Sequence, residues 1–451
     1  MPKETEIKLR VTPETLAALR QHPLLAGRSR DGWQTHLLCN QYYDTPEHDL
    51  ARNRVALRLR RDGEQVIQTL KSQGQSVAGL SERNEWDWLL TQPELDFSLL
   101  DDQCWPAALA GLDRQRLQPV FSTDFNRDKA DLSWDYQGQP VTVEAALDQG
   151  KVLAGSQEEA LCELELELRT GDPAALLELA CALAADLPLM PCDISKAERG
   201  YRLYDADSYS LNLPVPDLPA DLPLDEAFTR LAWQLLGNSQ RLAEQYRFNG
   251  HWRLLEDWVQ HLGELRALLS SPGQAVPRAS SSALRSALDA LLADWRPLVQ
   301  SGLQDEQVRR AAPQRFASEL DQPRWGQFSL GCSAWLLRQA WQTGRNERGQ
   351  KLGQSLLGKW LPRMLADESR AMALPHYLGR PGALGEQLPR LERLLVWLRP
   401  ARAVLDLPET DRLYGELHSL HQQLLQKVSP EELQTRLRTL LGLAAWKQLQ
   451  K

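Results

Sequence analysis

The first residues of the chain carry four charged side chains at alternate positions, Glu4, Glu6, Lys8 and Arg10. On a β-strand, alternate side chains point to the same face, so all four charges would share one surface. Carboxylates followed by cations on one surface can bind a metal ion beside a polyanion. The segment therefore predicts a site for a metal ion and a polyanion on an N-terminal strand.

The same alternation of charged and apolar residues recurs along residues 1–205. It is found in the segments 54–60, 66–71, 83–88, 121–129, 141–148 and 162–169. For any one strand, a half-exposed sheet with its charged face in water explains the pattern equally well. Here the charged faces are rich in Arg and Glu, and short helices expected at 12–21 and 173–185 could cover the apolar faces. The alternative is a closed barrel with the charges inside, and a barrel of about eight strands has room for one small ligand.

Such an interior would hold both cations and carboxylates. An arginine guanidinium can bind two phosphate oxygens at once, and glutamates supply the hard oxygen ligands that Mg²⁺ or Mn²⁺ prefers. A divalent ion would also relieve the repulsion between carboxylates buried near one another. Cations and metal together suit a linear triphosphate. The cations concerned are Lys8, Arg58, Arg60, Lys71, Arg83 and Arg127, and the glutamates are Glu4, Glu6, Glu163, Glu165 and Glu167.

The N-terminal pattern Glu4-x-Glu6-x-Lys8 resembles the ExExK signature of the CYTH domain, the triphosphate tunnel metalloenzyme superfamily. Further elements follow in the family's order over residues 1–205: Arg58-Leu59-Arg60, Lys71, Arg83-x-Glu85, Arg127, Asp148, Glu163-x-Glu165-x-Glu167 and Lys196. The resemblance implies a closed antiparallel eight-stranded β-barrel with flanking helices and a central tunnel.

The resemblance also implies roles for these residues. The catalytic set would be Glu4, Glu6, Lys8 and Lys196. Substrate would be bound by Lys8, Arg58, Arg60, Lys71, Arg83, Arg127 and Lys196. The metal, Mg²⁺ or Mn²⁺, would be held among Glu4, Glu6, Glu85, Asp148, Glu163, Glu165 and Glu167. The spacing leaves open which of Glu163, Glu165 and Glu167 are ligands, because all three share a face.

The second half of the chain has a different spacing of apolar residues. Residues 206–224 contain four prolines without a regular period and predict a linker. From residue 225 to 451, apolar residues recur every three or four positions and predict an all-α domain, with helices near 225–245, 280–300, 386–405 and 430–449. The fold class expected is α+β, a barrel followed by a helical bundle. The helical half resembles a degenerate CHAD domain, which implies polyphosphate as a further partner, although its histidines are scattered.

Composition narrows the remaining possibilities. Residues 1–210 hold 22 Lys and Arg against 35 Asp and Glu, whereas residues 211–451 hold 30 against 25. This basic excess is too small to argue for nucleic-acid binding. The six cysteines form no CxxC pair or Cys/His cluster, which favours reduced thiols. No signal peptide and no apolar run of membrane-spanning length is recognisable, so we expect a cytoplasmic protein without a membrane partner.

Together these features predict a metal-dependent inorganic triphosphatase that converts triphosphate to pyrophosphate and phosphate. Neither a Ser/His/Asp or Cys/His arrangement nor a P-loop is present. Related tunnels serve thiamine triphosphatases and one class of adenylate cyclase, and these stay open as alternatives. A non-catalytic polyphosphate-binding protein is the alternative of a different class. Oligomeric state and the choice between Mg²⁺ and Mn²⁺ are not encoded in any pattern found.

Overall fold

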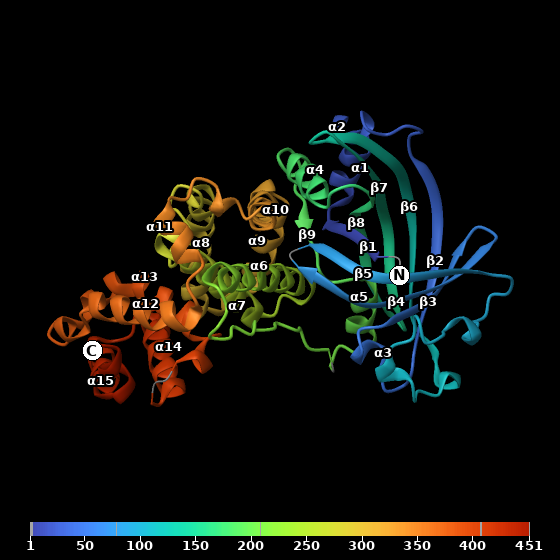
Figure 1. Ribbon diagram of the computed structural model, residues 1–451. Helices are drawn as coiled ribbons and strands as arrows, with labels where there is room; N and C mark the ends of the chain where they lie inside the picture. The colour runs from blue at the N-terminus through green and yellow to red at the C-terminus, as the bar shows by residue number, and fades with distance from the viewer. Residues whose placement is uncertain (1–2, 78, 208, 406–407, 451) are drawn as a thin grey trace. The chain divides into compact units, whose positions relative to one another are not determined.

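The computed structural model describes residues 3–77, 79–207, 209–405 and 408–450 (Figure 1). The chain forms two compact units. The first comprises residues 1–212 together with 317–334, and the second comprises 213–316 together with 335–451. Each unit is described by itself below.

The first unit is built on a closed antiparallel β-barrel, as the sequence predicts. The strand order is β5-β4-β3-β2-β6-β7-β8-β1, and pairing of β1 with β5 closes the barrel. A short ninth strand pairs with the end of β1. The strands are β1 (Lys3–Arg10), β2 (Gln34–Asp44), β3 (Ala56–Asp62), β4 (Gln65–Val77), β5 (Leu80–Leu90), β6 (Gln118–Tyr136), β7 (Gln139–Ala154), β8 (Gln157–Thr170) and β9 (Met190–Pro191).

Strand β1 lies between β5 and β8 and thus brings the N-terminal charges beside residues far along the chain. Glu4 is paired with Arg83 of β5, while Glu6 and Lys8 are paired with Glu167 and Glu165 of β8. Directly opposed residues on one face of a sheet have Cβ atoms about 5 Å apart. The register therefore places the N-terminal and C-terminal glutamates of the barrel side by side.

The expected local signals are present at the turns and helix ends. Gly63 adopts φ +58° in the hairpin between β3 and β4, where the Asp62-Gly63 pair predicts a turn. Helix α1 (Pro13–Gln21) begins after Thr12, whose side chain accepts a hydrogen bond from the Thr15 backbone N–H. Short helices α2 (Pro23–Ala26) and α3 (Asp49–Arg52) follow, and α4 (Ala174–Ala184) forms where a helix is expected after Pro173.

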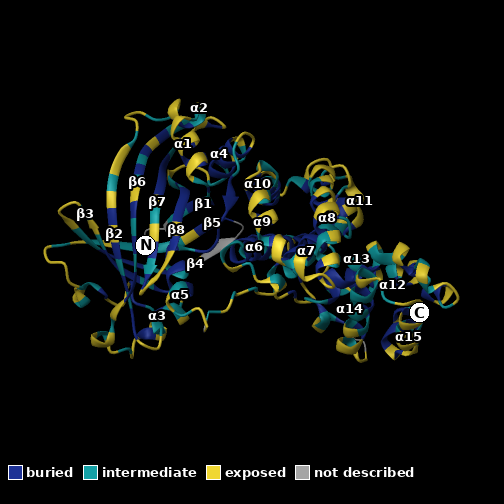
Figure 2. Cartoon of the chain, turned by 180° about the vertical axis from the view of Figure 1, so that it is seen from behind, coloured by how far each residue is buried: buried dark blue, intermediate teal, exposed yellow. Residues whose placement is uncertain are grey.

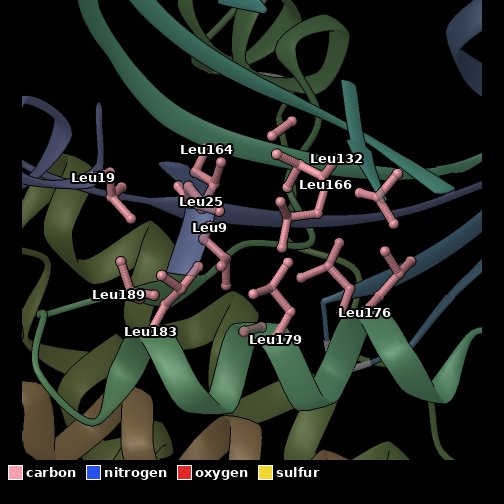
Figure 3. Packing of buried hydrophobic residues seen from close by; sticks show 14 of the residues in the cluster. Leu9, Leu19, Leu25, Leu132, Leu164, Leu166, Leu176, Leu179, Leu183 and Leu189 are labelled. Carbon is pink, nitrogen blue, oxygen red and sulfur yellow. The ribbon is translucent and has the colours of Figure 1, made fainter. Parts of the chain in front are cut away.

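The apolar face of the barrel is covered from outside by helices. Figure 3 shows leucines of α4, among them Leu176, Leu179 and Leu183, facing Leu9 of β1 and Leu164 of β8. All of these side chains are buried. Each strand thus buries one face against helices, which leaves its charged face to line the barrel interior.

A helix from the second half of the chain completes this cover. Helix α10 (Pro323–Leu337) contributes Leu330, fully buried in the same cluster as the α4 leucines. The Gln327 side-chain amide donates to the Ala185 carbonyl at 3.2 Å. A Cβ on Gly326 would lie 2.0 Å from the Leu189 carbonyl oxygen, so only glycine permits this approach. The barrel unit therefore depends on residues of α10, which lie far beyond its last strand, β9, in the sequence.

The second unit is helical, and its helices show buried and exposed stripes side by side (Figure 2). Rings of Tyr246, Trp258, Trp295 and Phe316 pack edge to face with centroids 4.8–5.5 Å apart. Its helices are α6 (Leu224–Asn249), α7 (Trp252–Leu268), α8 (Ser282–Gly302), α9 (Glu306–Leu320), α11 (Glu347–Gly353), α12 (Leu357–Met372), α13 (Leu388–Leu398), α14 (Thr410–Gln426), α15 (Pro430–Gly442) and α16 (Ala444–Leu449). Helix α9 crosses the division between the units at residue 316.

Two of the four helices expected here are shorter in the structure than the sequence predicts. The segment 386–405 is helical only to Leu398, two residues before Pro400, which cannot continue the hydrogen-bond ladder. The segment 430–449 is two helices, because Leu443 is extended at φ −64° and ψ 139°. Within the described residues, no helix is both long enough and apolar enough to span a membrane.

Candidate functional site

The interior of the barrel encloses a cavity of about 260 Å³ lined almost entirely by charged side chains. The charges come from seven of the eight barrel strands and from helix α5 (Lys196–Tyr204), which begins at the Ser195 N-cap. Predicted site residues on its wall are Glu4, Glu6, Lys8, Arg58, Arg60, Lys71, Arg83, Glu85, Arg127, Glu165, Glu167 and Lys196. The two remaining predicted residues, Asp148 and Glu163, are fully buried beside the cavity and do not line it.

Three glutamates lie in one row across adjacent strands of the barrel. Glu167 of β8 is paired on one side with Glu6 of β1 and on the other with Glu144 of β7. Arg169 bonds both Glu144 and Glu167, and Glu6 has only the Lys8 ammonium, at 3.4 Å, among the ion pairs of the described chain. Burial, and then the charges of Glu4 and Glu144, raise the pKa of Glu167 to about 7 in spite of Arg169. Glu167 is therefore the carboxylate of this row whose charge the neighbouring cations offset least.

A second set of carboxylates lies deeper and is fully compensated. Oxygens of Asp148, Glu163 and Glu165 lie within 4.8 Å of one another. Lys196 contacts all three, with its Nζ 2.7 Å from Asp148 and 2.9 Å from Glu165. Arg127 binds Asp148 in bidentate fashion at 2.7 and 2.6 Å and reaches Glu165 at 2.6 Å. Although burial opposes it, the charges of Arg127 and Lys196 hold the pKa of Asp148 below its usual value.

Helix α5 is fixed to the barrel by a buried arginine network. Arg199 contacts Glu159 at 2.9 Å and Glu163 at 3.3 Å, and Arg202 contacts Glu159 at 2.7 Å. The arginine side chains are fully buried. Losing one partner of such a network leaves a buried charge uncompensated, which is strongly destabilising. The network thereby fixes Lys196, at the first turn of the helix, against the cavity.

Arg60 is an interior cation that forms no ion pair with a carboxylate in the described part of the chain. Its Nε donates to the Asn40 side-chain oxygen at 2.8 Å. Burial, and then the positive charges of Arg58 and Arg127, lower the pKa of Arg60 to about 10. A guanidinium held beside two other cations is stabilised by an anion in the cavity.

The opposite wall carries a mixed network. Lys71 lies 2.8 Å from Glu4 and 3.0 Å from Glu85, and Arg58 lies 3.6 Å from Glu85. These contacts link side chains of strands β1, β3, β4 and β5. The cavity wall therefore mixes cations and carboxylates on all sides, and Glu167 is its carboxylate with a raised pKa.

Sequence reasoning missed several residues of the cavity wall. Lys129 lies 2.9 Å from Glu144, and Arg169 lies 2.7 Å from the same carboxylate. Both follow a predicted site residue by two positions, Arg127 and Glu167, so the strand period was a usable signal. The remaining missed polar residues on the wall are Tyr42, Thr69, Asp87, Glu144 and Ser195.

The glutamates on the cavity wall fit a divalent cation better than the deep set of carboxylates does. The deep set of Asp148, Glu163 and Glu165 is already neutralised by arginine and lysine. Glu4, Glu6 and Glu167 offer carboxylate oxygens directly on the cavity wall, each with fewer cation contacts than the deep set, and the pKa of Glu167 is raised to about 7. Hard oxygen donors of this kind suit Mg²⁺ or Mn²⁺.

Comparison with known proteins agrees with this arrangement. Residues 2–201 match the family model of the CYTH domain. This match confirms, for those residues, the CYTH resemblance predicted from the sequence. The inorganic triphosphatase of Haemophilus influenzae is 35% identical over 203 residues, which make up 45% of this chain and 55% of that protein. The chain thus spans about half the length of this curated relative.

Solved structures with similarity to the CYTH region include two described as adenylate cyclase candidates. One, from Hippeastrum, is described as having a dominant triphosphatase activity; it is 22% identical, covers 44% of this chain and 95% of its own, and has a TM-score of 0.33. The other, from Bacillus halodurans, is 21% identical, covers 41% of this chain and 90% of its own, and has a TM-score of 0.27.

Proposed function

We propose that the barrel hydrolyses inorganic triphosphate to pyrophosphate and phosphate with the help of Mg²⁺ or Mn²⁺. The observation that carries the proposal is the convergence of cations and carboxylates from distant strands in one enclosed cavity of about 260 Å³. Support also comes from the CYTH match over residues 2–201 and from the similarity to an inorganic triphosphatase.

The cations would bind the substrate. Arg60, whose guanidinium forms no ion pair among the described residues, would bind a phosphate in bidentate fashion. Arg58, Lys71, Arg83 and Arg127 add positive charge around the same space. Lys8 and Lys196 lie on either side of Glu165, at 3.2 and 2.9 Å, and would offset charge that develops on the reacting phosphate.

The carboxylates would bind the metal ion and accept the proton of the attacking water. We assign Glu4, Glu6 and Glu167 as metal ligands. In this assignment Glu85 positions Lys71, and Glu165 positions Lys8 and Lys196. A bound divalent ion would polarise the phosphoryl oxygens and neutralise charge in the transition state. Water attacks the terminal phosphorus in line, pyrophosphate departs, and an interior glutamate accepts the proton of the water. In this proposal Asp148 and Glu163 position Arg127 and Lys196 instead of binding metal.

The size of the cavity favours a bare triphosphate over a nucleotide. Pockets for drug-sized ligands usually measure about 300–1,000 Å³, and this cavity is smaller. A thiamine triphosphatase or a cyclase would need space for an organic group as well. Among the expectations for the rest of the protein, a CHAD-like helical half that binds polyphosphate and a cytoplasmic location remain predictions.

The test is a phosphate-release assay on the full-length protein with tripolyphosphate, thiamine triphosphate and ATP. We expect tripolyphosphate to have the highest kcat/KM, with activity only when Mg²⁺ or Mn²⁺ is added and reversible loss in chelator. Preference for either organic triphosphate would contradict the substrate. No hydrolysis of any of the three would instead favour a non-catalytic phosphate-binding barrel.

A further inference from the structure

The helical unit contains a cavity that is separate from the barrel interior and much larger, about 1,030 Å³. It lies among the end of α7, the 3₁₀ turn at Gly273–Ala275, helix α8 and the start of α13. All of its lining residues belong to the second compact unit. This volume is at the upper end of the range for small-molecule sites, about 300–1,000 Å³.

Three arginines gather at one side of this cavity, Arg266, Arg278 and Arg285. Arg266 is neutralised by Asp289, with contacts of 2.8 and 3.0 Å. Arg285 donates only to neutral oxygens, the Ser281 hydroxyl at 3.2 Å and the Arg278 carbonyl at 2.7 Å. In the part of the chain that the structure describes, neither Arg278 nor Arg285 forms an ion pair. Two guanidiniums without counter-charge therefore face one cavity.

The electrostatic cost of this grouping is visible at Arg285. Partial burial, and then the charges of Arg266 and Arg278, lower the pKa of its guanidinium. The cavity's other arginines are compensated, since Arg296 contacts Glu392 at 2.6 Å and Arg393 binds Glu368 at 2.8 Å. The uncompensated charge is thus localised at the Arg278 and Arg285 side of the cavity.

Beyond these charged residues, the wall combines polar side chains with an apolar part; the polar ones include Gln274, Gln300 and Asn346, and the apolar part includes Leu269, Val276, Leu292, Pro297 and Pro389. A bare inorganic anion would be desolvated against these side chains without burying any apolar surface of its own. A ligand with both an anionic group and an apolar body would satisfy both parts of the wall. We propose that this cavity binds an organic phosphate whose phosphate contacts Arg278 and Arg285 and whose planar apolar body packs against the leucine, valine and proline wall.

The proposal is tested by calorimetric titration of the full-length protein in metal-free buffer. The probe is 1-naphthyl phosphate, and 1-naphthol and pyrophosphate represent its two halves alone. We expect one site per chain for the intact probe and at least tenfold weaker binding at that site for each half. No saturable binding of 1-naphthyl phosphate, or equal affinity for pyrophosphate, would overturn the proposal.

Variants assign the binding to this cavity. Arg278→Gln with Arg285→Gln should weaken the probe at least tenfold, and Ala293→Trp, at an exposed position on the cavity wall, should block it without changing charge. The matched control, Arg310→Gln with Arg370→Gln, removes the same charge from exposed helix positions and should leave binding intact. Loss of binding in Arg60→Gln, with retention in the Arg278 and Arg285 variant, would assign the probe to the barrel and overturn the proposal.

Discussion

The two cavities of this protein are built on opposite principles. The barrel cavity is about 260 Å³, and ionised side chains from strands and helix α5 line nearly all of it. The cavity of the helical unit is about 1,030 Å³, and its wall combines charged and polar side chains with an apolar part. The first suits a ligand that is charged along its whole length, and the second suits a ligand with one anionic end and an apolar body. By our two proposals, the cavities would bind phosphates of different chemistry.

The largest expected effect separates the cavities by chemistry. Glu6→Ala removes a proposed metal ligand from the glutamate row and should lower triphosphate turnover by at least about a hundredfold. Binding of 1-naphthyl phosphate in the helical unit should be unchanged. The matched control is Glu64→Ala, at the exposed hairpin between β3 and β4. Turnover near that of the control at saturating Mn²⁺ would remove Glu6 from the site.

A smaller effect on substrate binding is expected from a substitution on the inner face of β3, compared with one on its outer face. Arg60→Gln should weaken triphosphate binding about 10- to 100-fold, because it removes charge-assisted hydrogen bonds of about 1.5–3 kcal/mol. Arg61→Gln, one position along and exposed, should leave KM unchanged. Steady-state kinetics of the two variants provide the comparison. Equal KM values for them would show that the alternation does not separate substrate-binding from solvent-facing residues.

The third test concerns the stability of the barrel unit. Leu330→Ala in α10 opens a cavity in the core beneath the barrel and should lower the free energy of unfolding by about 2–5 kcal/mol. Leu337 is 36% exposed, so the control Leu337→Ala should lower the free energy of unfolding much less. Urea titrations followed by residual triphosphatase activity report on the barrel. Identical midpoints for both variants would show that α10 does not stabilise this unit.

The smallest effect is a pH dependence confined to the helical unit. Burial, and then the neighbouring His421 and Arg399, lower the pKa of His418, although Glu264 opposes them. The unfolded chain then takes up a proton at higher pH than the folded state, so stability is lost as pH falls below about 6.5. His418→Gln should reduce the loss of melting temperature between about pH 7.5 and 5.5. The exposed His376→Gln should not, and an equal response of both would contradict the assignment.

How far the sequence predicts each region follows from the periodicity of its elements. A strand has only two faces, so the alternation at Glu4, Glu6 and Lys8 predicts which side chains share a face, and the family resemblance added that this face lines a closed barrel. The alternation does not say how far along each strand the cavity extends, and Lys129 and Arg169 were missed for that reason. Nor does it show that Lys196 and Arg199 of α5 would cover Glu163, because this depends on where the helix docks.

The helical half was much less predictable. Its amphipathic pattern identified helices but not the partners that they pack against, so the docking of α10 in the core of the barrel unit could not be foreseen. The arginines of the large cavity come from α7, the following loop and α8, with no common spacing. Such a site is assembled by tertiary packing and leaves no local signature in the sequence.

The most direct test of the central claim is a crystal structure of the full-length protein with tripolyphosphate and Mn²⁺, using the anomalous signal of manganese to locate the ion. We predict an anomalous peak at the carboxylates of Glu4, Glu6 and Glu167, with the phosphate chain inside the barrel and in contact with Arg60. A peak at Asp148 and Glu163 would contradict the metal assignment. Phosphate density outside the barrel would contradict the account as a whole.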